Sequence, residues 1–129
     1  MDTSVLILLD RLDKSKLPSE PSISSISLAE LSVGPLLADS DSTRAVRQRH
    51  LQQAEADFDP LPFDPAAARA FGRVASSLRS SGRKPASRTY DAMIAAIAIA
   101  NDLPLFSCNP DDFAGIDGLT LVAIPHPDA

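Results

Sequence analysis

Four carboxylate side chains stand beside apolar segments of the chain instead of within charged stretches: Asp2, Glu30, Asp91 and Asp112. Taken singly, each has an ordinary structural explanation, as a loop acid, a helix-capping partner, a first-turn residue and a turn residue respectively. Brought into one cleft, four carboxylates repel one another unless some are protonated or a cation lies among them. Such an all-oxygen set suits Mg²⁺ or Mn²⁺, and it lacks the thiolates and imidazoles that favour zinc.

The places of these acids along the chain favour one shared cleft. Asp2 lies between the place of the expected first strand and an expected helix. Asp112 comes shortly after an expected strand that ends at Cys108. Both acids then lie at the carboxyl ends of strands, which is the edge where open α/β sheets bind ligands. Glu30 and Asp91 fall in the first turns of two helices, so their side chains can point into the same crevice.

The elements that must position these acids are helices alternating with short extended segments. Apolar periodicity and the placement of Pro and Gly predict helices over residues 4–17, 27–34, 42–58, 65–81 and 92–100. Extended segments are expected at residues 22–25, 61–63, 104–108 and 119–124. Three helix caps are expected: Ser27 with Glu30 as its partner, Ser42 or Thr43, and Asp64 before Pro65. This alternation indicates a parallel α/β sheet with helices on both faces.

Charge is distributed unevenly along the chain. The net charge of −5 argues against nucleic acid as a partner, since such proteins gain affinity from Lys and Arg that neutralise phosphates. However, residues 65–90 contain no acid and hold six of the 12 Lys and Arg residues. This basic stretch is either a local positive surface or an ordinary solvated helix face, and charge alone leaves both open.

Composition indicates a single globular domain over residues 1–129. The single cysteine, Cys108, cannot form an intrachain disulfide, which favours a reducing cytoplasm. The longest apolar runs are too short to cross a bilayer, and no basic segment precedes them as in a signal peptide, so no membrane association is expected.

Four segments, in chain order, resemble the four motifs of the PIN-domain ribonucleases, and within them the VapC-type toxins of toxin–antitoxin pairs. The first three are Asp-Thr-Ser-Val-Leu-Ile at 2–7, Ser-Leu-Ala-Glu-Leu-Ser-Val-Gly at 27–34 and Tyr-Asp-Ala-Met-Ile-Ala-Ala at 90–96. The fourth, Cys-Asn-Pro-Asp-Asp-Phe at 108–113, is similar to a segment of the Thr-Arg-Asn-x-x-Asp-Phe type. The four motifs cover essentially the whole chain, so together they are more specific than any one alone.

The resemblance implies a PIN-like three-layer α/β/α sandwich with a mainly parallel central sheet. It implies roles for six residues: Asp2 and Asp91 as principal Mg²⁺ ligands (Mn²⁺ being the other candidate), Glu30 and Asp112 completing the cluster, Ser4 hydrogen-bonding within the site, and Asn109 orienting Asp112 or a water. Asp111, beside Asp112, is the alternative fourth acid.

The activity implied is hydrolysis of RNA phosphodiester bonds to 5′-phosphate and 3′-hydroxyl ends. Transfer or ribosomal RNA is the implied substrate, a VapB-like antitoxin the implied partner that blocks the cleft, and a homodimer the implied assembly. In such an enzyme, Arg79, Arg83 and Arg88 of the basic stretch are candidates for positioning the RNA.

Two positions depart from the family pattern. Members begin with three to five apolar residues that form the central strand, whereas here Met1 alone precedes Asp2, so the first strand is expected to be truncated and the natural start to lie upstream. Ser107 and Cys108 stand where the family has Thr-Arg, which removes a cation near the site.

Two other functions compete with this interpretation. A phosphatase that uses Asp2 as nucleophile would carry a second aspartate two residues later, where this chain has Ser4. A catalytically impaired PIN-fold module for binding or regulation would not need the intact acidic set. Neither His50 nor His126 is placed for catalysis, and Cys108 lies in an apolar strand, where a core role is favoured.

Overall fold

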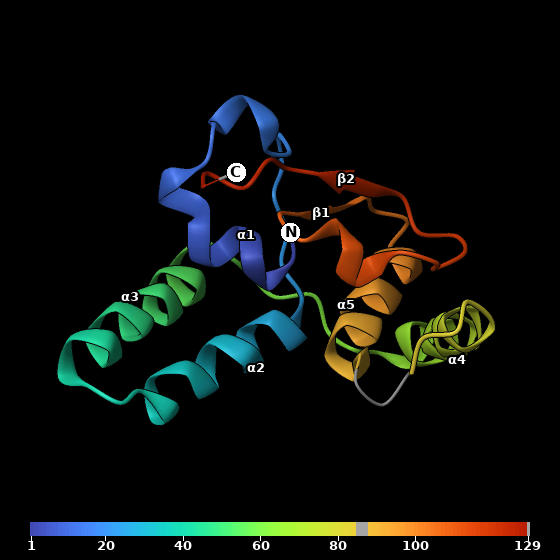
Figure 1. The fold of residues 1–129 in the computed structure, drawn as a ribbon, viewed down its shortest axis with the longest axis horizontal. Helices are drawn as coiled ribbons and strands as arrows, with labels where there is room; N and C mark the ends of the chain where they lie inside the picture. Colours follow the sequence, from blue (N-terminus) through green and yellow to red (C-terminus); the bar gives the residue numbers. More distant parts are fainter. Residues whose placement is uncertain (85–87, 129) are drawn as a thin grey trace.

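The fold is known from a computed structural model that describes residues 1–84 and 88–128. The first half of the chain contributes α1 (Thr3–Leu8), α2 (Ser25–Val33) and α3 (Asp41–Asp57). Three 3-10 turns lie between them: η1 (Leu9–Arg11), η2 (Lys14–Lys16) and η3 (Gly34–Leu37). Figure 1 shows these helices gathered on one side of the molecule.

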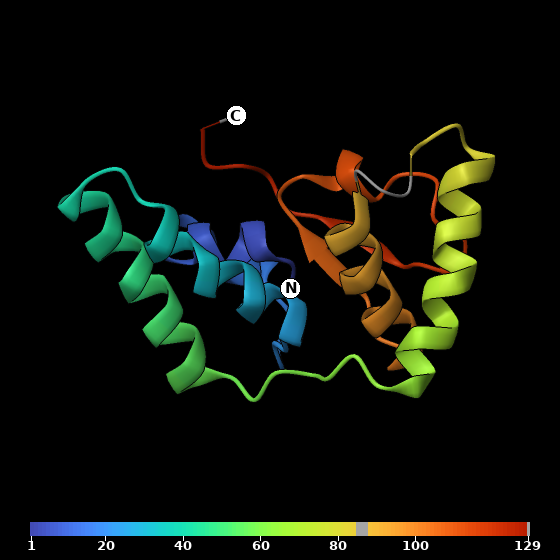
Figure 2. The ribbon, with the colours of Figure 1, turned by 90° about the horizontal axis from the view of Figure 1, so that it is seen from below.

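The second half contributes the remaining helices and the sheet. Its elements are α4 (Pro65–Ser80), α5 (Thr89–Ala100), β1 (Leu105–Ser107), the 3-10 turn η5 (Pro110–Phe113) and β2 (Leu121–Ala123). The apolar run predicted to be a buried helix is α5, in which six Ala and Ile residues are buried and Ala95 and Ala96 have no exposure. Figure 2 shows α1–α3 on one side of β1 and α4–α5 on the other, which confirms the expected α/β architecture.

The parallel sheet is small. In the described part of the chain it has two strands, with Leu105 opposite Leu121 and Ser107 opposite Ala123. The strand predicted at 22–25 is reduced to a single parallel bridge between Ser24 and Leu61. The chain enters α2 directly after Ser24, so no room is left for a longer ladder.

Met1 and Asp2 lie between these two pieces of sheet. The amino group of Met1 donates to the carbonyl of Ser22 over 2.8 Å, and the Asp2 N–H donates to the carbonyl of Phe106 over 3.0 Å. Met1 is buried, and burial lowers the pKa of its amino group. The short first strand expected from the sequence is therefore represented by these two residues, which place Asp2 at the end of the sheet.

Two helix caps differ from the predicted ones. Ser24, not Ser27, caps α2, and its hydroxyl accepts from the Ser27 N–H over 3.0 Å. Ser40, not Ser42 or Thr43, caps α3. In both cases the capping serine has an extended backbone immediately before the helix, which is the conformation a cap requires and which neighbouring serines lack.

The other helix boundaries agree more closely with expectation. The predicted cap of α4 is confirmed, because the carboxylate of Asp64 accepts from the Ala67 N–H over 2.9 Å and Pro65 follows it. The helix expected from Ser4 towards Pro18 ends early: α1 stops at Leu8 and the chain continues in 3-10 turns. No described helix is long and apolar enough to cross a membrane.

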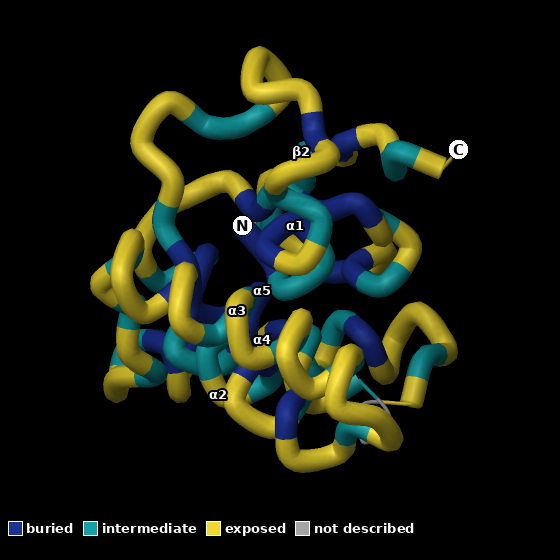
Figure 3. Tube along the Cα trace, turned by 90° about the vertical axis from the view of Figure 1, so that its left-hand side faces the viewer, coloured by how far each residue is buried: buried dark blue, intermediate teal, exposed yellow. Residues whose placement is uncertain are grey.

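Two groups of buried side chains support the two sides of the fold. One surrounds α1 and includes Val5, Leu6 and Ile23, whereas the other lies between α4 and α5 and includes Val74, Leu78 and Ala95. Figure 3 shows that α3 is largely exposed, and Ala54 alone of its residues is buried, whereas Val5 and Leu6 of α1 are buried. The acids considered next lie where the two groups meet.

Candidate active site

Asp2 is a buried carboxylate held by three donors. Its side chain caps α1, and Oδ1 accepts from the Ser4 hydroxyl over 2.6 Å and from the Val5 N–H over 3.1 Å. Its other oxygen, Oδ2, accepts from the Ser107 hydroxyl over 2.6 Å. The residue is 4% exposed, so these bonds offset the cost of removing the charge from water. They also fix the direction in which the remaining lone pairs point.

Ser4 and Ser107 connect Asp2 to the end of β1. The Cys108 N–H donates to the Ser4 hydroxyl over 3.1 Å, and the Asn109 N–H donates to the Ser107 hydroxyl over 2.9 Å. Ser4 was expected to bond within the site, and the structure places it there. The sequence analysis named Ser107 only as a departure from the family pattern and not as a partner of Asp2, although a hydroxyl in a buried apolar strand is a signal, because such groups need a partner.

Glu30 is oriented by a contact with α1 and not by a helix cap. The hydroxyl of Thr3 lies 2.6 Å from Oε1 of Glu30 and 3.1 Å from the buried hydroxyl of Ser27. Glu30 therefore does not form the capping pair with Ser27 that was considered for it. Thr3 is a second residue whose role in the site was not predicted, since its partner lies 27 positions away.

Asp91 and Asp112 face each other from α5 and η5, with Arg88 beside both. Nη1 of Arg88 lies 2.9 Å from Oδ1 of Asp112 and 4.0 Å from Oδ2 of Asp91. The three side chains are between 29% and 43% exposed, so the group opens to solvent. Arg88 was predicted to position RNA, and in this structure its guanidinium is paired with the acids.

Electrostatic interactions join the four acids into one site. The pKa of Asp91 is raised from 3.8 to about 6, first by burial and then by the charges of Asp112 and Glu30, with a smaller contribution from Asp2. Arg88 opposes this rise. Partial removal from water and repulsion by neighbouring negative charges both disfavour the ionised form of a carboxyl group and so raise its pKa. Asp91 thus interacts electrostatically with each of the other three motif acids, and Asp111 is not among the causes of the shift.

The donor set fits a divalent cation of the Mg²⁺ or Mn²⁺ kind. All four groups offer carboxylate oxygens, and their mutual repulsion is the feature that a bound cation would relieve. Within residues 1–84 and 88–128, however, no three acidic, histidine or cysteine side chains are close enough as they stand to hold one ion. Arg88 lies on the Asp112 side of the cluster and supplies positive charge there.

The remaining predicted residues make no side-chain hydrogen bond or ion pair to the four acids in the described part of the chain. Arg79 is in the last turn of α4, and Arg83 follows the helix with its Nη1 buried and without a hydrogen-bond partner in the described structure. The main-chain carbonyl of Asn109 accepts from the Asp112 N–H over 3.0 Å, whereas its side-chain role stays a prediction. Burial raises the pKa of Cys108, so its thiol is protonated at neutral pH and suits the core.

Comparisons with known proteins show relatives over almost the whole chain. The family model described as PIN domain matches residues 1–119. The chain is 39% identical over 127 residues to ribonuclease VapC5 of Mycobacterium tuberculosis, covering 96% of this chain and 91% of that protein. It is 27% identical over 132 residues to ribonuclease VapC1 of Rickettsia felis, covering 99% of this chain and 97% of that protein. The crystal structure of VapBC-5, a member of the VapBC family of toxin–antitoxin systems from M. tuberculosis, matches with a TM-score of 0.81 and 38% identity, over 97% of this chain and 95% of that one.

Proposed function

Because the chain belongs to the PIN-domain family, we propose that it is a metal-dependent endoribonuclease and the toxin of a VapBC-type toxin–antitoxin pair. The observation that carries the proposal is that Asp91 and Asp112, which come from two separate motifs, both lie beside the guanidinium of Arg88, 4.0 Å and 2.9 Å from its Nη1. A phosphatase nucleophile at Asp2 is disfavoured, because Ser4 stands where such an enzyme carries its second aspartate.

Asp2 and Asp91 are the residues we assign as principal ligands of Mg²⁺, with Glu30 and Asp112 completing the set. A bound Mg²⁺ would lower the pKa of a water and stabilise negative charge on the reacting phosphate. The chain's own residues prepare the site: Ser4 and Ser107 hold Asp2 in one orientation, and Thr3 holds Glu30. Hydrogen bonds of this kind, made to a metal-binding carboxylate by residues that do not touch the ion, influence how tightly the ion is bound.

RNA is the substrate that we propose, of the transfer or ribosomal class. Arg79 and Arg83 are assigned to its phosphates, because Arg79 lies in the last turn of α4 and Arg83 follows shortly after that helix ends. Because α4 and α5 pack together and run in opposite directions, this end of α4 lies beside the start of α5, where Asp91 lies. The names of the relatives, both called ribonuclease, support this assignment.

The partner that we propose is a VapB-like antitoxin that covers the acidic site. Support comes from the matched crystal structure, which is of a VapBC complex. We further propose a homodimer that acts in the cytoplasm, where the lone cysteine, Cys108, remains reduced. Sedimentation of the purified protein with and without the antitoxin would test the assembly, and a monomer in both cases would contradict it.

Cleavage of RNA by matched variants tests the function. The wild type, Asp2→Asn and Asp91→Asn are compared with Asp111→Asn, in which an exposed acid next to the site is neutralised. We expect Mg²⁺-dependent cleavage by the wild type and by Asp111→Asn, and its loss in the other two variants. Equal cleavage by all four proteins would refute the metal ligands, and no cleavage by a wild type that still binds the antitoxin would indicate a binding module.

A further inference from the structure

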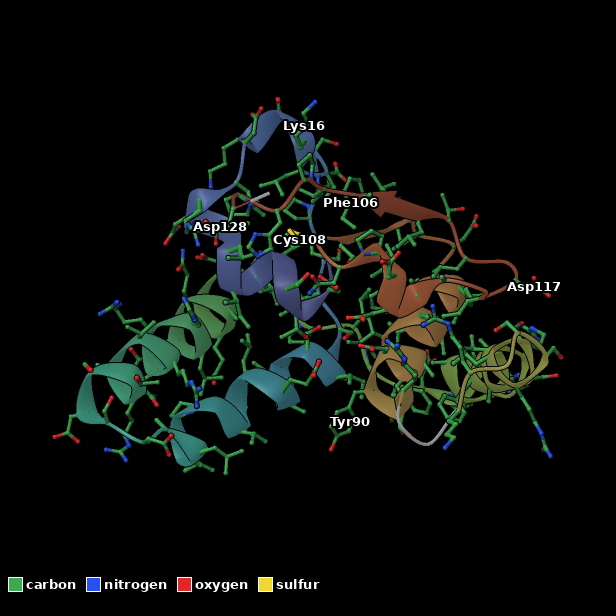
Figure 4. The ribbon with its side chains drawn as sticks, viewed as in Figure 1. Lys16, Tyr90, Phe106, Cys108, Asp117 and Asp128 are labelled. Atoms are coloured by element: carbon green, nitrogen blue, oxygen red, sulfur yellow. The ribbon has the colours of Figure 1, made fainter. Side chains whose placement is uncertain are left out.

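Tyr90 presents an aromatic ring to solvent at the rim of the acidic site. It is 62% exposed, and Figure 4 shows its side chain projecting from the N-terminal end of α5, away from the body of the domain. The next residue is Asp91, and Arg88, two positions earlier, is paired with Asp112. Other large hydrophobic side chains of high exposure in the described structure are aliphatic: Ile7, Val33, Leu36, Leu37, Val46 and Leu103.

The ring has no structural task in the core. Ala92 and Ile94, on the inner side of the same helix, are 1% and 3% exposed and anchor α5 against α4 without it. A Tyr ring that is left in water loses the stability that burial would provide, which amounts to roughly 1.5–3 kcal/mol for a large side chain. A side chain placed this way is available for a ligand that approaches the acids.

An acidic site repels the phosphates of its own substrate. The chain has a net charge of −5, and the guanidinium nearest to the acids is engaged by Asp112. Stacking of a base on an aromatic ring supplies attraction that does not depend on charge, and it requires a base that is not paired in a duplex. Tyr90 is placed to supply that attraction one residue from Asp91.

We propose that Tyr90 is the platform on which an unpaired base of the RNA stacks beside the acidic site. The inference rests on the proposed ribonuclease function and adds to it a residue that contacts the substrate. Tyr90 thereby contacts the substrate, while the acids act on the phosphate next to the stacked base.

The composition of the chain makes the test direct. Tyr90 is its single tyrosine and there is no tryptophan, so intrinsic tyrosine fluorescence reports on this ring alone. The probe is a single-stranded RNA of about 12 nucleotides, of the length that such grooves bind, compared with the same RNA annealed to its complement. Titrations are made in EDTA, where the RNA stays intact. We expect quenching of the fluorescence by the single strand and little quenching by the duplex.

Substitutions separate stacking from other roles. By fluorescence anisotropy of labelled RNA, Tyr90→Leu should raise the Kd for the single strand by about 5- to 150-fold, the equivalent of one stacked base. Tyr90→Phe, which keeps the ring, should bind like the wild type, as should Leu36→Ala, a control that removes an exposed side chain on η3. Duplex binding should be the same in all four proteins.

The outcomes distinguish the inference from the proposed function. If the wild type binds the single strand and Tyr90→Leu binds it equally well, the stacking role is wrong while the ribonuclease function stands. If Tyr90→Phe loses as much affinity as Tyr90→Leu, the hydroxyl and not the ring makes the contact. If Tyr90→Leu alters only the size of the protein or its antitoxin complex, the ring contacts protein. If the wild type binds neither RNA, the stacking role is wrong, and RNA cleavage with Mg²⁺ decides the ribonuclease function separately.

Discussion

The hydroxyl of Ser107 donates to Oδ2 of Asp2 over 2.6 Å and so joins the end of β1 to the cap of α1. Ser107 is fully buried, and its oxygen also accepts from the Asn109 N–H. Ser107→Ala leaves a buried carboxylate oxygen and a backbone N–H without partners, each of which costs about 1–3 kcal/mol. We therefore expect a lower free energy of unfolding in urea. Ser32→Ala removes an exposed hydroxyl bonded within α2 and should change stability little; equal losses in both variants would contradict this account.

Thr3 orients Glu30 through a hydrogen bond of 2.6 Å. Thr3→Val keeps the shape of the side chain and removes the hydroxyl, so the carboxylate of Glu30 becomes free to turn. Loss of such an outer contact typically costs about 10- to 100-fold in metal affinity or activity. Calorimetric titration with Mn²⁺ and RNA cleavage should both show the loss. Thr120→Val, at an exposed position, is the matched control, and wild-type metal affinity in Thr3→Val would refute the role.

Asp91 makes the metal-free protein less stable as the pH rises. Its pKa is 3.8 in a model peptide and about 6 in the fold, so the folded state binds more protons between these values and stability falls over that interval. Asp91→Asn lacks this effect and should be more stable than the wild type above pH 6. We expect a difference on the order of 1 kcal/mol after allowance for solvent screening. Thermal unfolding in EDTA from pH 4 to 8 measures it, and parallel curves for the two proteins would disprove the shift.

Arg79 and Arg83 are expected to contact RNA phosphates. Each contact releases counterions, so replacing one arginine by Gln should weaken RNA binding and reduce the slope of log K against log salt by about 0.7 for single strands. Arg49→Gln, on the exposed helix α3, is the control. Arg88 is left out of this comparison because its substitution would also disturb Asp112. A slope unchanged by both substitutions would remove these arginines from the interface.

Two glycines should respond in opposite directions to replacement by alanine. Gly115 has a φ of +83°, and a Cβ there would lie 2.7 Å from the Ser81 hydroxyl, so Gly115→Ala should destabilise the fold by roughly 1–3 kcal/mol. Gly72 lies inside α4 with open space around it, and Gly72→Ala should stabilise the fold by about 0.5–1 kcal/mol. Urea unfolding of both variants provides the measurement, and the same sign in both would contradict the argument.

The helices that carry the site were predictable because their signals are local. The apolar run of α5 and the Asp64–Pro65 start of α4 lie within a few residues of what they determine, and both are confirmed. The caps of α2 and α3 were predicted wrongly, since several neighbouring serines can accept the same N–H groups. Which serine does so depends on where the extended chain ends, as at the bridge between Ser24 and Leu61.

By itself, the sequence determined the family and the α/β class and proposed four acids as the site, because each motif is a short run of residues whose chemistry can be read in order. Only the tertiary structure decided what those acids contact. Ser107 and Asp2 are 105 positions apart, and Arg88 and Asp112 are 24 apart. Hydrogen bonds and ion pairs act over a few ångströms of space whatever the separation along the chain, so no local pattern encodes these pairs.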